Sequence, residues 1–386
     1  MHVNYHAGQR VTHLSVRNWK NFTQLDADLE QRVFLIGPNA SGKSNFLDLF
    51  RFLRDIVSVG GGFREAIQRR GGVSAIRSLA ARREPSVDVT VALGTSENPN
   101  LWNYTLRFSQ DKQRRPRIEA EKVLREAREL FSRPNKEDVD DPDRLGQTFL
   151  EQVNVNREFR EIADFFNSVR YLHIVPQLVR DPDRSVGRKD DPFGGDFIKR
   201  VATTGKRTRD TRLRRITKAL QVAVPQLREL ELWQDDVGRP HLRGKYEHWR
   251  PQGAWQMEDQ FSDGTLRLTG LLWAALDGAG PLLLEEPELS LHPEVVRFIP
   301  QLFARIGRKG GRQVILSTHS PELLQDQGIG VDEVLLLIPK GEGTEVRVAA
   351  KIDQVRRLLD GGLSMADAVL PHTRPQRIEQ LRLWEE

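Results

Sequence analysis

The sequence predicts an α/β fold: a head with a mixed parallel and antiparallel sheet, plus a mainly helical insertion. An apolar run at residues 33–36 leads into a glycine-rich loop, and apolar residues at helical spacing follow that loop (Phe46, Leu47, Phe50, Leu53 and Val57). Residues 87–93 and 102–108 are apolar at every second position. Later in the chain, apolar runs alternate with helical patterns, which is typical of parallel βαβ units.

Each part of the head has its own signal. The turn-forming residues 94–100 separate the two alternating segments, which predicts an antiparallel hairpin. The parallel part is expected from buried strands at 281–284, 314–316 and 334–338. Helices are expected between them, at 266–276 and 295–306.

Residues 109–254 predict a compact, mainly helical insertion. Residues 117–131 fit a charged amphipathic helix, and the acidic stretch 135–143 fits a link. A second helix carries Phe159, Ile162, Phe166 and Val169 on one face, and residues 181–195 predict a loop. The expected domains are residues 1–108 and 255–370 for the two parts of the head, 109–254 for the insertion, and 371–386 for a helical C-terminal tail.

Composition restricts the class of protein. Of the 386 residues, 38% are hydrophobic and 29% charged, which indicates a strongly charged globular chain. No apolar run approaches the roughly 20 residues that a membrane helix needs, and no secretory signal is readable. The chain has no cysteine, which excludes disulfides, thiol chemistry and zinc–thiolate sites. We expect a cytoplasmic protein.

A basic segment at residues 199–218 leaves two interpretations open. It contains nine basic residues and one acid, Asp210, although the formal net charge of the chain is only +5. Such a segment could attract the phosphate backbone of DNA. It is equally consistent with a solvated helical face.

The glycine-rich loop has the spacing of a phosphate-binding P-loop. It comprises Gly37, Pro38, Asn39, Ala40, Ser41, Gly42, Lys43 and Ser44. Its glycines allow successive N–H groups to point at phosphate oxygens, at a helix N-terminus whose dipole favours anions. The lysine supplies charge to the β- and γ-phosphates, and the Ser44 hydroxyl can bind Mg²⁺. We therefore predict an ATP site that also includes Asn45.

A buried strand at 281–284 ends in two carboxylates, Glu285 and Glu286. α/β folds bind ligands at this edge of the sheet, and side chains that alternate along a strand face different ways. One carboxylate is expected to hold Mg²⁺ and the other to polarise the attacking water. The strand at 314–316 also ends in polar residues, and they include His319.

A fourth motif, Ser262, Asp263, Gly264 and Thr265, directly precedes an apolar helix. It can form a second anion-binding helix N-terminus. In isolation, a plain helix cap would be the favoured interpretation.

These four motifs, in this order, resemble the ABC-type ATPases of the structural-maintenance-of-chromosomes (SMC) and RecF-like branch. Among them, the small bacterial ATPases related to the overcoming-lysogenisation-defect (OLD) proteins are similar. The resemblance covers about residues 1–108 and 255–370 and implies the P-loop NTPase fold of an ABC head. It assigns residues 37–44 to the Walker A motif, residues 262–265 to the signature, and Glu286 to the catalytic glutamate. Glu285 stands where many relatives carry aspartate, and His319 matches the switch histidine.

The resemblance implies further roles. Gln177 is the expected glutamine that bridges Mg²⁺ to the insertion, with Gln68 as its rival. Residues 14–22 resemble the family's first strand and turn, which would place Trp19 or Lys20 near the adenine, although Trp19 could equally be a core aromatic. Residues 290–293 fall at a loop that crosses the dimer interface.

The family's mechanism implies a homodimer. Two heads dock head to tail, so that the signature of one protomer closes over ATP held by Lys43 of the other. The expected role is an ATP-gated switch in bacterial antiphage defence or DNA repair, acting through a partner effector such as a nuclease or toxin encoded nearby. The alternative is a regulatory scaffold that sequesters or activates a toxin or enzyme without binding DNA.

Two other functions fit the sequence poorly. The motif set and the large insertion are unlike those of a transporter ATPase subunit. OLD proteins carry a Toprim nuclease domain after the head, but only 67 residues follow His319, and no paired aspartates follow the strand at 334–338. We therefore expect any nuclease activity to come from a partner.

Overall fold

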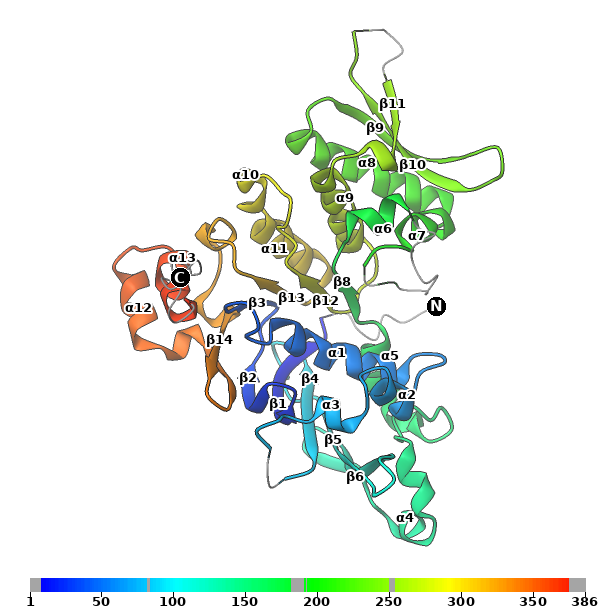
Figure 1. Ribbon diagram of the computed structural model, residues 1–386, viewed down its shortest axis with the longest axis vertical. Helices are drawn as coiled ribbons and strands as arrows, with labels where there is room; N and C mark the ends of the chain where they lie inside the picture. Colours follow the sequence, from blue (N-terminus) through cyan, green and yellow to red (C-terminus); the bar gives the residue numbers. More distant parts are fainter. Residues whose placement is uncertain (1–7, 82–83, 182–190, 192, 250–253, 375–386) are drawn as a thin grey trace, which may run out of the picture. The chain divides into compact units, whose positions relative to one another are not determined.

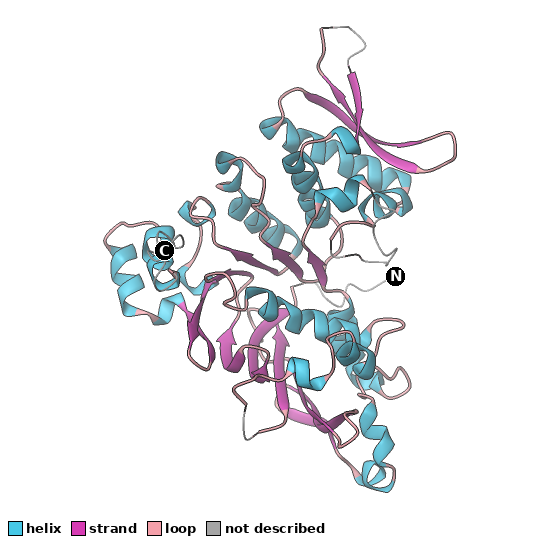
Figure 2. Ribbon diagram, in the orientation of Figure 1, coloured by secondary structure: helices cyan, strands magenta, loops and turns pink. Residues whose placement is uncertain are grey.

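The computed structural model describes residues 8–81, 84–181, 191, 193–249 and 254–374. The chain divides into two compact units. Unit 1 comprises residues 1–170, 279–283 and 300–386, and unit 2 comprises residues 171–278 and 284–299. These two units do not coincide with the predicted head (residues 1–108 and 255–370) and insertion (residues 109–254), so the predicted domain division stays a prediction. The predicted α/β fold with a mixed sheet is confirmed (Figures 1 and 2).

Unit 1 contains an antiparallel sheet of six strands. Its order is β2-β1-β4-β5-β6-β7, and each neighbouring pair runs antiparallel. The hairpin predicted at 87–108 is therefore confirmed. The strands are β1 (Arg10–Trp19), β2 (Phe22–Asp28), β4 (Val87–Gly94), β5 (Trp102–Gln110), β6 (Pro116–Arg125) and β7 (Arg128–Arg133).

The second sheet carries the nucleotide motifs, in the order β15-β14-β3-β13-β12-β8. Strand β3 lies between β13 and β14 and is parallel to both, and β15 pairs antiparallel with β14. Residues 282–283 of β12 and Arg170 of β8 belong to unit 1. The strands are β3 (Arg32–Ile36), β8 (Arg170–Leu172), β12 (Leu282–Glu285), β13 (Val314–Thr318), β14 (Val334–Lys340) and β15 (Gly343–Val348).

Helix α1 packs its apolar face in the core of unit 1. Phe52 of α1 lies 5.2 Å from Trp19 and 5.7 Å from Phe108, measured between ring centroids, and all three rings are buried. The helices of unit 1 are α1 (Lys43–Val57), α2 (Phe63–Gln68), α3 (Val73–Ile76), α4 (Lys136–Asp140), α5 (Arg160–Asn167), α11 (Ile299–Gly310, from residue 300), α12 (Asp353–Asp360) and α13 (Met365–Thr373).

Unit 2 combines helices with a small antiparallel sheet of order β11-β10-β9. Sequence analysis did not predict this sheet within the insertion. The elements are α6 (Pro176–Arg180), α7 (Phe197–Thr203), α8 (Lys206–Ala223), β9 (Leu227–Gln234), β10 (Pro240–Tyr246), β11 (Ala254–Met257), α9 (Asp263–Leu276) and α10 (Pro293–Val296). Part of the loop predicted at 181–195 and most of the predicted tail, residues 375–386, lie outside the described residues.

The helix predicted at residues 117–131 is wrong, because this segment forms the hairpin of β6 and β7. The turn between the strands is Glu126 and Ala127, whose φ angles are 48° and 65°. Tight hairpin turns need positive φ and normally use Gly, Asn or Asp, so two helix-favouring residues at this position hid the turn. The link predicted at 135–143 contains α4, which Asn135 caps.

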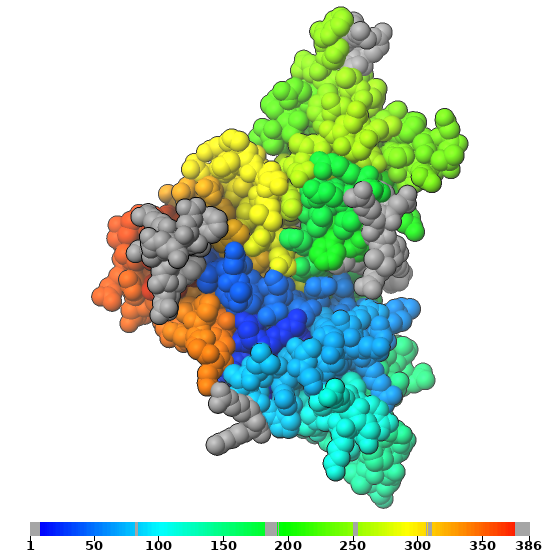
Figure 3. All heavy atoms as spheres, in the orientation of Figure 1, coloured from blue at the N-terminus to red at the C-terminus, as the bar shows by residue number. Residues whose placement is uncertain are grey.

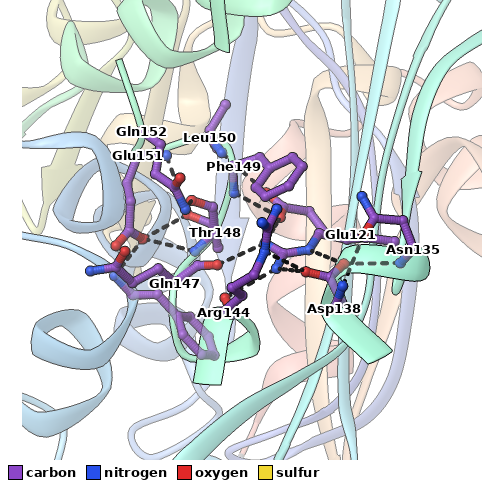
Figure 4. A network of polar contacts seen from close by, with 12 residues as sticks. Glu121, Asn135, Asp138, Arg144, Gln147, Thr148, Phe149, Leu150, Glu151 and Gln152 are labelled. Atoms are coloured by element: carbon purple, nitrogen blue, oxygen red, sulfur yellow. Dashed lines mark hydrogen bonds and ion pairs between the residues drawn. The ribbon is translucent and has the colours of Figure 1, made fainter. Parts of the chain in front are cut away.

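A buried charged network holds β6, β7 and the segment after them together (Figure 4). Arg133 donates to both Asp138 oxygens at 3.1 and 2.6 Å and to the carbonyl oxygens of Gln147 and Arg144 at 2.8 and 3.0 Å. The arginine also pairs with Glu121 at 3.5 Å. The side chains of Arg133, Glu121 and Asp138 are all 0% exposed. A charge taken out of water this completely needs its partners.

Candidate functional site: a nucleotide-binding loop and a strand-end carboxylate pair

Residues 37–44 connect β3 to α1 and form a curled loop. Ala40 and Gly42 have φ angles of 62° and 96°, so the backbone turns through left-handed conformations before the helix begins. Gly42 is the N-cap, no side chain caps the helix, and the first turn has no acidic residue. The helix N-terminus therefore directs its N–H groups and dipole at this loop without a competing carboxylate.

Side chains inside the loop fit a phosphate group. Lys43 Nζ donates to the carbonyl oxygens of Gly37 and Pro38 at 2.8 and 3.1 Å, so the ammonium lies within the curl of the loop. Ser41 Oγ is buried and has no hydrogen-bond partner among the described residues. Ser44, the predicted Mg²⁺ ligand, is exposed at the start of α1. Together, the Lys43 ammonium and the Ser41 hydroxyl are suited to bind an anion such as a nucleoside triphosphate.

Asn21 fixes the loop from outside, and sequence reasoning missed it. Its Nδ2 donates to the Ser41 carbonyl oxygen at 2.9 Å and to Thr344 Oγ1 at 2.8 Å. Its Oδ1 accepts from Asn45 Nδ2 at 2.7 Å. One amide thus joins the loop, α1 and β15. Thr344 lies 323 residues away in sequence, so no local pattern indicates this bond.

Gly37→Ala is expected to weaken ATP binding by about tenfold or more while the chain still folds. A Cβ at residue 37 would lie 2.4 Å from Ser41 Oγ and 2.7 Å from the Leu337 carbonyl oxygen, so the loop must shift. Binding of a fluorescent ATP analogue measures the effect. Gly341→Ala is the matched control, because a Cβ there has nothing within 4 Å. Equal affinities for the two variants would contradict the assigned role of the loop.

Trp19 does not offer a surface to a nucleotide, which corrects its prediction as an ATP-binding residue. Its side chain is 0% exposed, and Nε1 donates to the Asn45 carbonyl oxygen at 3.0 Å. Lys20 instead pairs with Asp48 on α1 at 2.7 Å. Burial opposes the charged form of Asp48, but the charges and hydrogen bonds of Arg70 and Lys20 outweigh it and lower the Asp48 pKa.

His319 follows β13 at the carboxyl edge of the sheet. Thr318, the last residue of β13, pairs in parallel register with Ile36, the last residue of β3. His319 and Gly37 are the next residues of these two neighbouring strands, and His319 is exposed. The structure therefore brings the predicted switch histidine to the same edge as the P-loop.

Glu285 and Glu286 belong to unit 2, where Tyr171 of β8 and His173, which directly follows β8, contact the first of them. The Tyr171 hydroxyl donates to Glu285 Oε2, and His173 Nδ1 lies 3.1 Å from the Glu285 carbonyl oxygen. A carbonyl only accepts, so this ring nitrogen carries the proton. Sequence analysis missed both residues, because their contacts with Glu285 join positions more than 110 residues apart.

The chain turns sharply after Glu285. Glu286 has a φ of 44°, so the second carboxylate leaves the strand in a left-handed conformation. Arg267 of α9 is the nearby cation: burial lowers its pKa, and the carboxylates of Asp263, Glu286 and Glu288 act in the opposite direction. Its Nε is buried without a hydrogen-bond partner among the described residues.

The predicted signature forms the start of α9. Ser262 is the N-cap, and its Oγ accepts from the Thr265 N–H at 3.2 Å. Arg180 pairs with Asp263 at 2.6 Å and so holds the cap from α6. A Cβ on Gly264 would lie 2.7 Å from the Ser290 carbonyl oxygen. Ser262 therefore caps α9, and this start of the helix packs tightly against the loop that follows Glu286.

The two candidate glutamines lie in different units. Gln177 is exposed near the start of α6 in unit 2, and Gln68 is exposed at the end of α2 in unit 1. Among the described residues, no group of three or more His, Asp or Glu side chains is arranged to hold a metal ion by itself. The predicted Mg²⁺ ligands Ser44, Glu285 and Gln177 therefore stay a prediction.

Fold and site together define an ABC-type ATPase head of the SMC and RecF branch. Residues 32–325 match the family described as "AAA domain, putative AbiEii toxin, Type IV TA system". Because the match covers more than half of the chain, the chain belongs to this family.

Solved structures show the same fold. An SMC head bound to the C-winged helix domain of ScpA is 12% identical and covers 87% of this chain and 96% of its own, with a TM-score of 0.54. The SMC head with a coiled coil and joint from Pyrococcus yayanosii is 10% identical and covers 92% of this chain and 100% of its own, with a TM-score of 0.50. At such low identities the likeness concerns the fold alone.

One curated relative matches over a short stretch. The DNA replication and repair protein RecF of Roseiflexus castenholzii is 50% identical over 44 residues. This chain spans about a tenth of the RecF length, because the match covers 11% of each protein. Separately, no helix among the described residues is both long and apolar enough to span a membrane.

Proposed function

We propose that this protein binds and hydrolyses ATP, and that ATP joins two copies head to tail. The observation that carries the proposal is the P-loop itself: an uncapped helix N-terminus with Lys43 held inside the curl. His319 at the same sheet edge supports it, since a γ-phosphate sensor must lie beside the phosphate-binding loop.

In this proposal each polar group has one task. Lys43 and the loop N–H groups would hold the phosphates, and Ser44, Glu285 and Gln177 would hold Mg²⁺, which would neutralise charge on the phosphate oxygens. Tyr171 orients Glu285 through its hydroxyl. Glu286 accepts a proton from the attacking water, and His319 contacts the γ-phosphate. The signature of one protomer, residues 262–265, closes over the ATP of the other.

We further propose that this switch controls a partner effector, such as a nuclease or toxin, in cytoplasmic antiphage defence or DNA repair. The family description, which names a toxin of a type IV toxin–antitoxin system, favours defence. The RecF match favours DNA repair and a nucleic-acid link. The SMC head solved with ScpA offers a precedent in the fold for a bound protein partner.

The alternative is a scaffold that sequesters or activates a toxin or enzyme without binding DNA. The structure of the basic segment bears on this choice. Arg200 and Arg212 both pair with Asp277, and Arg209 pairs with Asp210, so these arginines are committed within unit 2. DNA binding through residues 199–218 stays a prediction.

Mixing two inactive variants tests the head-to-tail site. Lys43→Ala removes the P-loop charge, and Ser262→Arg blocks the signature. Each variant alone is expected to lack ATP turnover, whereas an equimolar mixture should recover part of the activity, because one site in each mixed dimer is intact. Phosphate release measures turnover. If the mixture stays inactive although both variants fold and associate, the composite site is wrong.

A further inference from the structure

Unit 2 contains a groove between helix α8 and strand β9, whose segments are green and yellow-green in Figure 3. Its volume is about 660 Å³. One wall consists of α8 side chains, which include Lys206, Arg214 and Lys218, and the other is the segment 228–232. Neither the P-loop nor the predicted catalytic residues contribute to it.

Strand β9 is an edge strand, and its outward backbone groups are unpaired. At the turn into β10, the Asp235 N–H donates a hydrogen bond to the Arg239 carbonyl oxygen, with a distance of 3.0 Å. Because paired residues of antiparallel strands alternate, Trp233 and Glu231 bond to β10, and Leu230, Leu232 and Gln234 present N–H and C=O groups away from it. Within the described part of the chain, no other residue hydrogen-bonds to these outward groups. An edge of this kind accepts another strand.

The helix wall supplies positive charge. Lys206, Arg214 and Lys218 are exposed, and none forms an ion pair with a described residue. The side chains of Leu230 and Leu232 alternate with Glu231, so they lie on the face of the sheet that packs against α8. A strand added to β9 would therefore turn every second side chain towards the α8 cations.

We propose that this groove docks an extended, acidic segment of a partner protein, which adds a strand to β9. Main-chain hydrogen bonds would give affinity, and acidic residues at alternate positions would pair with α8. The proposal rests on the proposed function, because the segment belongs to the effector that the ATP switch controls.

Nucleic acid fits this groove less well. The β9 wall also carries Glu229 and Glu231, which alternate with Leu230 and Leu232, and Glu231 is paired with Arg243 at 2.6 Å. An acidic strand can turn its charged side chains towards α8 and away from these carboxylates, whereas a nucleic acid carries a charge at every phosphate. A DNA backbone also offers no alternating donors and acceptors at strand spacing, so the free edge of β9 would stay unsatisfied. A peptide strand satisfies both walls at once.

Fluorescence anisotropy with the full chain tests the proposal. The probe is a labelled ten-residue peptide that alternates Glu and Thr. Its controls are the Lys–Thr peptide, a Glu–Thr peptide with N-methylated backbone amides, and duplex DNA. Only the unmodified acidic peptide is expected to bind. Arg214→Glu combined with Lys218→Glu should weaken it about tenfold or more, whereas Arg207→Glu, an exposed α8 cation outside the groove, should change it much less.

A second variant tests whether the peptide pairs with the edge of β9. Proline is tolerated where a strand N–H faces away from its neighbour, so Gln234→Pro removes one outward donor and should weaken the acidic peptide, while Gln234→Ala should not. Equal binding of the N-methylated peptide, duplex DNA bound in place of the peptide, or no binding of any probe would overturn the proposal. ATP turnover of these variants should be unchanged, which separates failure of the groove from failure of the ATPase proposal.

Discussion

Glu286→Gln is expected to lower ATP turnover by about 10²-fold or more and to leave ATP binding intact. The amide keeps the size and shape of the side chain but cannot take a proton from water. Because the P-loop is unchanged, ATP still loads, and the dimer that hydrolysis would separate should accumulate. Phosphate release measures the rate, and light scattering with ATP measures the dimer.

Glu294→Gln is the matched control for this change. Glu294 lies in α10 of the same unit, is exposed, and has no assigned part in the site, so its variant should retain normal turnover. A Glu286→Gln protein that stays monomeric with ATP would contradict the head-to-tail mechanism, even if turnover is lost. Retained turnover would instead contradict the assignment of Glu286.

Arg133→Met is expected to lower the free energy of unfolding by about 3–5 kcal/mol, because it removes one partner of a buried charged network. Asp138 would keep a buried carboxylate without its cation, and Glu121 would lose its contact with Arg133. The Gln147 and Arg144 carbonyl oxygens would also lose their donor. Thermal or urea unfolding measures the loss.

Arg107→Met is the control for this comparison. Arg107 pairs with Asp88 at 2.6 Å, but its side chain is 48% exposed, so its pair should contribute less than about 1 kcal/mol. Equal destabilisation by the two variants would show that the burial of Arg133 does not set its effect.

The same network predicts a pH dependence. Burial raises the pKa of Glu121 from 4.5 to about 7, although the Phe149 N–H, Arg133, the Leu150 N–H and the Tyr104 hydroxyl favour its charged form. The folded state therefore keeps a proton that the unfolded chain releases above its own pKa, so this residue makes stability fall as pH rises from about 4.5 to 7. Glu121→Gln should flatten this part of the profile of unfolding temperature against pH. An unchanged profile would mean that folding does not raise the pKa of Glu121.

Sequence reasoning found the motifs whose chemistry is local. A P-loop is a contiguous spacing between a strand and a helix, and residues 37–44 keep that spacing in the structure. The strand ends at Glu285 and Thr318 could likewise be predicted from the sequence, because short apolar runs end there. Trp19 was assigned wrongly, since an aromatic residue that borders a motif has the same local pattern whether it packs in the core or on a ligand.

Contacts between residues far apart in the chain could not be predicted from local sequence patterns. Asn21 meets Thr344, and Tyr171 meets Glu285 across 114 residues, and each bond depends on strand order in the sheet. The hairpin of β6 and β7 was missed for a different reason. Its residues favour a helix locally, and pairing with β5 overrides that preference.

The position of β3 in the sheet has a consequence for how the protein forms in the cell. The neighbours of β3, β13 and β14, begin at Val314 and Val334, so the ribosome must make most of the chain before either can pair with it. Until then Val33, Phe34, Leu35 and Ile36, all buried in the finished sheet, remain an uncovered apolar strand. Such a segment is prone to aggregation and slow to reach its partners. ATP-binding competence should therefore arise late in synthesis, and a nascent chain that stops before β13 should need a chaperone to stay soluble.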